Sequence, residues 1–370
     1  KHIEYVEAQL LRVFNGEINK LIITQPSQYG KEINDLESVF TTKGWKKLGD
    51  LQVGDYVFNP SGTPVRVIAV SLKYRDEYEV DIGTPQQYET IRCHAKHDWT
   101  LLDRKRASKK FEIFETEQLF QLNLKQNSFN KKQNKTYKRN RFILPLRSPL
   151  ILEEKNFILH PYVLGAWLGD GSTKEAKISH SPNDQEVIKK IEVCGYAVNN
   201  TWIQAGTGVQ YTTFYNTNLI KDLRTIGVFK DKHIPEEYLL GSIEQRKELL
   251  AGLIDTDGYW SIDSGQVVIV NCNKKIIDGA TSILYSLGYH CSITTVQPTL
   301  SSSGIQGRQL VYRLCFSPRE EFPTVIPRKK ITKLSKVHKR QAIIAIRKAE
   351  IPGSGHCIQV DSEDGLYLVG

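Results

Sequence analysis

One helical motif occurs twice in this sequence, 87 residues apart, and each copy ends in an Asp-Gly pair. The two copies are VLGAWLGDG (Val163–Gly171) and LAGLIDTDG (Leu250–Gly258). Each copy has small residues four positions apart: Gly165 and Gly169, then Gly252 and Thr256. Residues at i and i+4 share one helix face, and small side chains there let two helix backbones approach closely. We therefore expect the helices to pack together and to place Asp170 and Asp257 side by side at their C-terminal ends.

Two acidic side chains related by a two-fold axis suit a reaction on both strands of a DNA duplex, whose symmetry they match. The alternative is a pair of unrelated core helices, each closed by a glycine cap. The second copy favours the first interpretation. Its run L-A-G-L-I-D-x-D-G resembles the signature of the LAGLIDADG homing endonucleases.

Size and composition favour a reduced, water-soluble protein of several domains. The chain has 370 residues, and no apolar run approaches the ~20 residues of a membrane-spanning helix. The N-terminal residues lack the apolar core of a signal peptide, so we expect a cytoplasmic protein of a bacterial host, encoded by a phage or prophage. Six cysteines are scattered without a C-x-x-C pair, which favours free thiols. Cys93-His94-x-x-His97 is at most half of a metal site, because no second half follows.

The positive charge is concentrated in one segment. Residues 101–150 hold 13 Lys/Arg against 4 Asp/Glu, which accounts for the whole net charge of +9. The alternatives are a solvated basic loop and an arm that follows a DNA backbone, and the nearby nuclease motif favours the arm. The predicted DNA contacts are Arg104, Lys105, Arg106, Lys109, Lys110, Lys131, Lys132, Lys135, Lys138, Arg139 and Arg141, with Arg328 and Lys330 further along.

The sequence around the two helices is typical of β structure. Residues 37–74 consist of short alternating apolar stretches separated by Gly-Trp, Gly-Asp and Ser-Gly turns. The pattern V-x-T-x-x-G-W-x-x-L-x-x-L-x-x-G-D-x-V resembles the first block of inteins, which have the Hint fold. HDWTLLD (His97–Asp103) resembles the second block, and HCIQVDSEDGLYLVG (His356–Gly370) resembles the C-terminal strands. This resemblance makes His97 the activating histidine and Asp361 the acidic splicing residue.

The first 31 residues have a different character. A helix pattern, the strand LIIT and P-x-x-x-G-K resemble the start of a phage terminase ATPase domain that stops inside its phosphate loop. Glu32 stands where a Ser or Thr would hold magnesium, so we expect no ATPase activity. The resemblance therefore makes residues 1–31 a host flank, interrupted by an intein at the phosphate loop.

Protein splicing is expected to be inactive. An intein begins with a Cys or Ser that attacks the preceding carbonyl, and that position falls on Glu32. A carboxylate there would give a strained anhydride in place of a thioester. The family's terminal His-Asn and following nucleophile are also missing from the sequence. Glu32, His97 and Asp361 are thus interpreted as remnants of a splicing site.

The resemblance to LAGLIDADG enzymes implies the site residues. Asp170 and Asp257 would hold Mg²⁺ (or Mn²⁺), with the carbonyls of Gly169 and Thr256 as further ligands. A lysine beside each scissile phosphate would stabilise developing charge. Lys232, before His-Ile-Pro, matches the first catalytic lysine. Lys329 is the choice for the second half, with Arg328 and Lys330 as alternatives.

The predicted fold class is α+β: an all-β Hint domain interrupted by a pseudo-two-fold αββαββ LAGLIDADG domain. The predicted domains are 1–31 (host flank), 32–145 (N-terminal Hint part, basic insertion about 101–145), 146–335 (endonuclease) and 336–370 (C-terminal Hint strands). We expect a monomer that makes a metal-dependent double-strand cut in a long DNA site, the intein-free terminase gene, without contact to membranes. The alternatives are a self-splicing intein with a secondary endonuclease and a non-catalytic DNA-binding protein.

Overall fold

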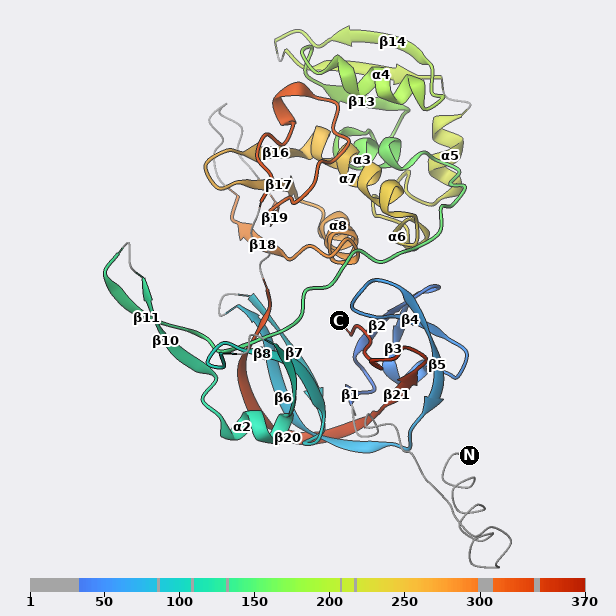
Figure 1. Cartoon of the computed structure of the whole chain (residues 1–370). Helices are drawn as coiled ribbons and strands as arrows, with labels where there is room; N and C mark the ends of the chain where they lie inside the picture. Colours follow the sequence, from blue (N-terminus) through green and yellow to red (C-terminus); the bar gives the residue numbers. More distant parts are fainter. Residues whose placement is uncertain are drawn as a thin grey trace, which may run out of the picture.

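The computed structural model describes residues 33–84, 87–107, 110–130, 133–206, 208–215, 218–298, 309–335 and 340–369. These residues form two lobes, one above the other in Figure 1. The β lobe is built from residues 33–143 and 340–369, and the α/β lobe from residues 161–331. The predicted host flank, residues 1–31, lies outside the described residues. The predicted α+β fold class is confirmed.

The β lobe contains two sheets, whose strands alternate buried and exposed residues with the period of two expected for a half-buried strand. The seven-stranded sheet has the order β1 (Ile33–Asn34), β7 (Gln87–Cys93), β6 (Tyr74–Thr84), β20 (Ala342–His356), β12 (Phe142–Ile143), β8 (Asp98–Asp103), β9 (Phe111–Glu115). The five-stranded sheet has the order β21 (Ile358–Val360), β5 (Pro64–Val70), β4 (Tyr56–Phe58), β2 (Ser38–Thr41), β3 (Gly44–Lys47). Two short helices, η1 (Leu48–Asp50) and α2 (Thr116–Gln121), complete the lobe.

Strand β20 joins the two ends of the chain into one core. It lies between β6 and β12, so residues more than 250 positions apart in sequence are neighbours in the sheet. The chain leaves the β lobe after β12 and returns to it at β20, at adjacent points. Ile143 is paired with Ala342, and the Leu144 N–H donates to the Gln341 carbonyl at 3.0 Å. The α/β lobe is therefore an insertion whose entry and exit lie side by side.

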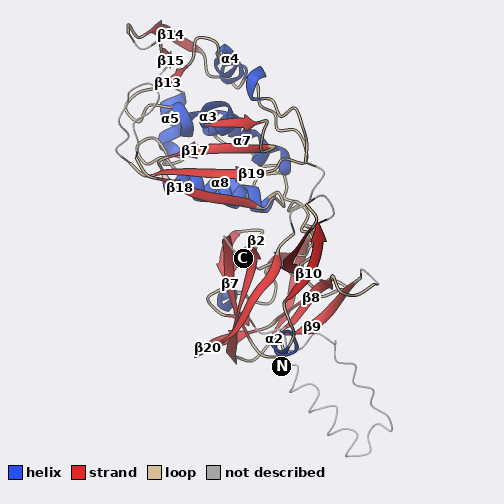
Figure 2. Cartoon of the chain, turned by 90° about the vertical axis from the view of Figure 1, so that its left-hand side faces the viewer, coloured by secondary structure: helices blue, strands red, loops and turns tan. Residues whose placement is uncertain are grey.

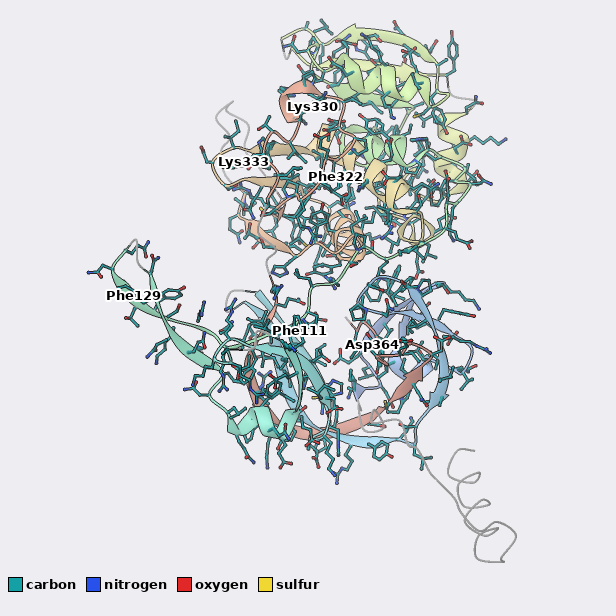
Figure 3. All side chains as sticks on the ribbon, in the orientation of Figure 1. Phe111, Phe129, Phe322, Lys330, Lys333 and Asp364 are labelled. Carbon is teal, nitrogen blue, oxygen red and sulfur yellow. The ribbon has the colours of Figure 1, made fainter. Side chains whose placement is uncertain are left out.

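A basic hairpin projects from the β lobe. Strands β10 (Lys125–Asn130) and β11 (Lys135–Asn140) pair with each other and extend away from the core (Figure 1). Phe129, which Figure 3 labels, lies near its outer end and is 56% exposed. The hairpin therefore forms a separate two-stranded sheet that carries an exposed aromatic ring.

The α/β lobe is made of two repeats with the same sheet order. The first contains α3 (Pro161–Asp170), β13 (Lys177–His180), α4 (Gln185–Val193), β14 (Val198–Ile203), β15 (Gln210–Phe214) and α5 (Leu219–Thr225). The second contains α7 (Ile243–Asp257), β16 (Gly258–Ser261), β17 (Gln266–Asn271), α8 (Lys274–Ser286), β18 (Cys291–Val296), β19 (Val311–Phe316) and η2 (Pro327–Lys329). Helix α6 (Glu236–Leu239) lies between them. The sheets are β13-β15-β14 and β16-β17-β19-β18, with the helices packed on one face (Figure 2).

The first repeat departs from the predicted αββαββ order at one strand. The bridge between Gly171 and Ile178 takes the place that the Gly258–Ile269 pair has in β16 and β17. The strand is reduced because the chain turns at once after Gly171, where the Lys174 N–H donates to the Ser172 hydroxyl at 3.2 Å. The apolar core of the lobe runs through both repeats and includes the inner faces of α3 and α7. No helix within the described ranges is both long and apolar enough to cross a membrane.

Candidate active site

Helices α3 and α7 touch through their glycines. A Cβ on Gly165 would fall well inside van der Waals contact of the Leu249 carbonyl oxygen. A Cβ on Gly252 would do the same at the Tyr162 carbonyl oxygen. The two contacts are equivalent under the pseudo-two-fold axis. The predicted close approach of the two helices is confirmed, and glycine at these positions is required by the spacing of the backbones.

The approach brings the two predicted acids together. A Cβ on Gly169 would lie 3.2 Å from the carboxylate carbon of Asp257, so Asp257 lies against the residue that precedes Asp170. Burial raises the pKa of Asp170 to about 6, and the nearby charge of Asp257 adds to the increase. Burial also raises the pKa of Asp257, although the Asn271 amide donates a hydrogen bond to it at 2.5 Å. Two carboxylates at the negative ends of two helices repel each other and both helix dipoles.

Each predicted lysine caps the helix of its own repeat. The Lys232 ammonium donates to the carbonyls of Leu168 and Gly169, both at 3.1 Å. The Lys329 ammonium donates to the carbonyls of Ile254 (3.2 Å), Asp255 (2.6 Å) and Thr256 (2.9 Å). Burial lowers the pKa of both lysines. The equivalent placement favours Lys329 over Arg328 and Lys330 as the counterpart of Lys232.

The lysine contacts bear on one prediction. The carbonyls of Gly169 and Thr256 were predicted as further metal ligands, and both accept hydrogen bonds from lysine. A cation could use these oxygens only beside or in place of an ammonium group. The two carboxylates are therefore the principal ligands that this site offers.

The carboxylate pair fits a hard divalent cation. The oxygens are partly desolvated, and Lys232 and Lys329 offset only part of the cost of holding both carboxylates charged, so a cation between them would relieve the rest. Among the described residues, no group of three or more His, Cys, Asp or Glu side chains is placed to hold a metal. Cys93, His94 and His97 are therefore not grouped in a way that could hold a metal ion. Any ion at the aspartates would take its remaining ligands from water or from the substrate.

Part of the predicted basic arm has a structural role. Arg141 makes two hydrogen bonds to the buried Asp103 carboxylate, at 2.7 and 2.6 Å. Arg106 pairs with Glu112, and Arg104 donates to the Asn140 carbonyl at 3.0 Å. Arg104 and Arg141 fasten the base of the hairpin to the end of strand β8, and Arg106 joins the residues after β8 to β9. Their role as DNA contacts stays a prediction. The sequence could not reveal these pairings, because each partner is set by the tertiary fold.

The remaining basic residues lie on the surface. Lys105, Lys110, Lys135 and Lys138 are exposed, and Arg139 is half-buried on β11. Lys109, Lys131 and Lys132 lie outside the described residues. In the other lobe Lys330, labelled in Figure 3, is exposed, whereas Arg328 pairs with Asp184. The hairpin lysines are thus the part of the predicted arm that is free to meet phosphates.

The predicted splicing remnants lie in the β lobe, away from the aspartates. His97 is buried against the Trp99 ring, with 4.7 Å between ring centroids, and lines a cavity of about 200 Å³. Ile33 and residues 365–369 line the same cavity, so both ends of the β lobe meet at His97. Asp361 is exposed and accepts from the Arg66 backbone N–H at 2.8 Å, which fastens β21 to β5. Glu32 lies outside the described residues.

Two functional residues were missed at the sequence level. Asn271 ends strand β17 and donates to Asp257. Asp255 is buried and accepts from the Tyr162 hydroxyl (2.8 Å) and from the Val325 N–H (2.8 Å), which ties α7 to α3 and to the segment before Lys329. A polar residue at the end of the apolar run VVIV was the available signal for Asn271.

Comparison with known proteins identifies part of the α/β lobe. A sequence profile described as Homing endonuclease matches residues 233–326. These residues include α7, α8 and the strands β16, β17, β18 and β19. The chain is 31% identical to the replicative DNA helicase DnaB of Mycobacterium intracellulare over 357 residues, covering 89% of this chain and 55% of that protein. The chain therefore spans little more than half the length of this relative.

Two further matches cover single parts of the chain. The homothallic switching endonuclease of Saccharomyces cerevisiae is 30% identical over 163 residues, which are 36% of this chain and 28% of that protein. The crystal structure of the gp41-1 intein matches with 18% identity and a TM-score of 0.21, covering 30% of this chain and 76% of that one. These matches support a DNA endonuclease of the homing endonuclease kind in residues 233–326, within the α/β lobe.

Proposed function

We propose that this chain cuts both strands of one long DNA site in a reaction that depends on a divalent cation. The observation that carries the proposal is the pair Asp170 and Asp257, held together by glycine-packed helices with one lysine at each helix end. Because the repeats are related by a pseudo-two-fold axis, one chain offers one acid and one lysine to each strand. A second copy of the chain is therefore not needed.

The carboxylates of Asp170 and Asp257 are the groups that would hold Mg²⁺ or Mn²⁺. The bound ion would polarise the scissile phosphate and lower the pKa of an attacking water. The water oxygen attacks phosphorus, its proton passes to solvent, and the bond from phosphorus to the leaving oxygen breaks. Lys232 and Lys329 stabilise the negative charge that develops on the phosphate oxygens. Burial lowers the pKa of each lysine, because desolvation disfavours the charged ammonium.

The target is the host gene at the point where the intein is inserted. The first 31 residues resemble a terminase phosphate loop, and the relative that matches most of the chain is a replicative helicase. Both hosts imply a target that encodes the phosphate loop of an ATPase acting on DNA. In the intein-bearing gene this site is interrupted, so the enzyme spares the gene that encodes it.

A plasmid assay tests the proposal. A plasmid carrying the host gene with the intein removed should be linearised by the protein with Mg²⁺, and a plasmid carrying the interrupted gene should stay intact. EDTA should stop the reaction. If the uninterrupted plasmid remains supercoiled with Mg²⁺ and with Mn²⁺, under conditions where the protein binds it, the chain is a DNA-binding protein without cleavage activity.

The hairpin β10–β11 serves as a second contact with the target. Replacing Lys135, Lys138 and Arg139 together with Gln should weaken DNA binding and lower the slope of log K against log salt by about 3, since each lost phosphate contact removes about 0.9. Fluorescence anisotropy between 50 and 300 mM salt measures this slope. Lys348→Gln, an exposed charge on β20, is the control. An unchanged slope in the triple variant would show that the hairpin does not touch DNA.

The splicing activity of the β lobe is expected to be absent. Glu32 cannot form the thioester that begins the reaction, whatever the geometry around His97. Incubation with a thiol should therefore leave the Lys31–Glu32 bond intact by mass spectrometry. Glu32→Cys, which restores the nucleophile, should make the same bond sensitive to thiols. Cleavage of the unaltered chain would contradict the expectation.

A further inference from the structure

Helix α8 of the second repeat holds the segment that carries the lysine of the first repeat. Asn273, the N-cap residue of α8, donates from its side-chain amide to the Lys232 carbonyl at 2.7 Å. Its amide oxygen accepts from the Lys275 N–H at 2.9 Å, which closes the first turn of the helix. Lys275 then pairs with Asp231 at 2.7 Å. Both Lys232 and the residue before it are therefore tied to one helix start.

Helix α4 of the first repeat makes the equivalent contact with the second repeat. Asp184, its N-cap residue, accepts two hydrogen bonds from the Arg328 guanidinium, one of them at 3.1 Å from Nε to Oδ1. The Asp184 side chain makes no capping bond to its own helix and is only 9% exposed. Its carboxylate is therefore directed at Arg328, the residue before Lys329.

The two contacts form a crossed pair. Each lysine donates to the helix carbonyls of its own repeat. The second helix of the other repeat holds the Lys232 carbonyl in one case and the side chain of Arg328, next to Lys329, in the other. The charges are reversed between the pairs. Asp231 meets Lys275 on one side, and Arg328 meets Asp184 on the other. In both repeats the start of the second helix holds the segment next to a lysine of the other repeat. The two contacts use different side chains, with the signs of the charges exchanged.

We propose that Asp184 and Asn273 are positioning residues for strand cleavage, each seating the lysine of the opposite repeat. This inference rests on the proposed nuclease function. Neither residue reaches the reacting phosphate, so each acts through the lysine that its partner segment carries. A displacement of a catalytic group by about 1 Å can slow a reaction about 100-fold, so the seating of each lysine affects rate more than DNA affinity.

The two positions are expected to differ in strength. The Asp184 carboxylate is only 9% exposed and accepts two hydrogen bonds from the 60% exposed Arg328, so its charge is the less screened of the two. The Asp231–Lys275 pair is about 60% exposed on both sides and contributes little, which leaves the neutral bond from Asn273 to hold Lys232. The second-repeat lysine is thus held by charge and the first-repeat lysine by an amide.

Isosteric substitutions separate positioning from folding. Asp184→Asn removes the charge that holds Arg328, and Asn273→Asp replaces the donor that faces the Lys232 carbonyl with an acceptor. Asn and Asp cap helices about equally well, so both helix starts persist. Asp278→Asn, on the exposed Lys274–Asp278 pair of α8, is the control. Each variant is assayed under single turnover on a duplex with both strands end-labelled, with DNA affinity measured in parallel.

The result expected is a rate lowered by about tenfold for each variant at unchanged affinity, combined with a specific pattern of couplings. Asp184→Asn should cause no further loss of cleavage rate in a chain that already carries Lys329→Met. In a chain that carries Lys232→Met, it should multiply the loss of rate that this substitution causes. Asn273→Asp should show the reverse pattern. Normal rates for both variants, or couplings to the wrong lysine, would overturn the inference while the wild-type chain still cuts. Absence of cleavage by the wild-type chain would instead contradict the proposed function.

Discussion

Replacing Asp170 with Asn is expected to abolish double-strand cleavage and, in the absence of divalent cations, to stabilise the protein. The rate should fall by at least about 1,000-fold, since the variant loses one ligand of the cation that activates the reaction. DNA binding should remain nearly intact, because the phosphates meet lysines and arginines rather than this carboxylate. Asp257→Asn should give the same loss of cleavage. Supercoiled-plasmid assays and anisotropy measure the two effects separately.

The gain in stability follows from the raised pKa of Asp170, about 6 in the folded chain against about 3.9 in an unfolded one. A group with a raised folded pKa is held less tightly when it is ionised. The contribution of Asp170 to stability is therefore most favourable below about pH 4 and is lost as the pH rises from about 4 through about 6. Asn cannot ionise, so Asp170→Asn should gain about 3 kcal/mol at pH 7.5 in EDTA and almost nothing at pH 4.

Thermal denaturation of the α/β lobe in EDTA at pH 4.5 and 7.5 tests the sign. Adding Mg²⁺ should stabilise the unaltered chain more than the variant, because the ion removes the repulsion that the substitution has already removed. Asp263→Asn, on an exposed turn of the same lobe, is the control. A variant less stable than the parent at pH 7.5 in EDTA would mean that the two carboxylates do not oppose each other.

Gly252→Ala is expected to destabilise the α/β lobe by about 3 kcal/mol, although alanine is the better helix former by about 1 kcal/mol. The added Cβ meets the Tyr162 carbonyl oxygen and lies 2.7 Å from the Ala166 backbone nitrogen. Backbone atoms cannot turn aside as a flexible side chain can. The helices must separate, and the carboxylates at their ends separate with them, so cleavage should fall by about 100-fold.

Gly165→Ala, which meets the Leu249 carbonyl on the equivalent contact, should give a similar result. Val193→Ala is the control, since it introduces alanine at the 84% exposed end of α4 without a neighbouring backbone. Urea denaturation followed by fluorescence gives the free energies, and plasmid cleavage gives the rates. If either glycine variant were more stable than the parent, the helices would not be in backbone contact.

The sequence was sufficient to predict the centre of the site. Gly165, Gly252 and the two aspartates lie on a motif of nine residues, and local spacing alone determines which face they share. Lys232 and Lys329 were found through the resemblance and occupy equivalent positions at the helix ends. Helix α7 begins seven residues before its motif, at the capping box of Ser242 and Gln245, and that signal was present in the sequence but not used.

The sequence was not sufficient where a charge has a distant partner. Arg141 stands in a basic run, but its guanidinium is held by Asp103 from a strand 38 residues earlier. Arg328 stands beside Lys329, but its partner Asp184 is 144 residues away. Composition identifies a positive segment, whereas only the fold distinguishes charges that face solvent from charges that hold strands together.

The pairing of Ile143 with Ala342 has a consequence for the history of this gene. Because the inserted lobe begins and ends at adjacent points of one sheet, a single excision between them would leave the pairings of β12, β8, β6 and β20 in place. A short turn could then join the cut ends. The α/β lobe could thus be inserted or deleted without a change in the strand pairings of the β lobe that carries it.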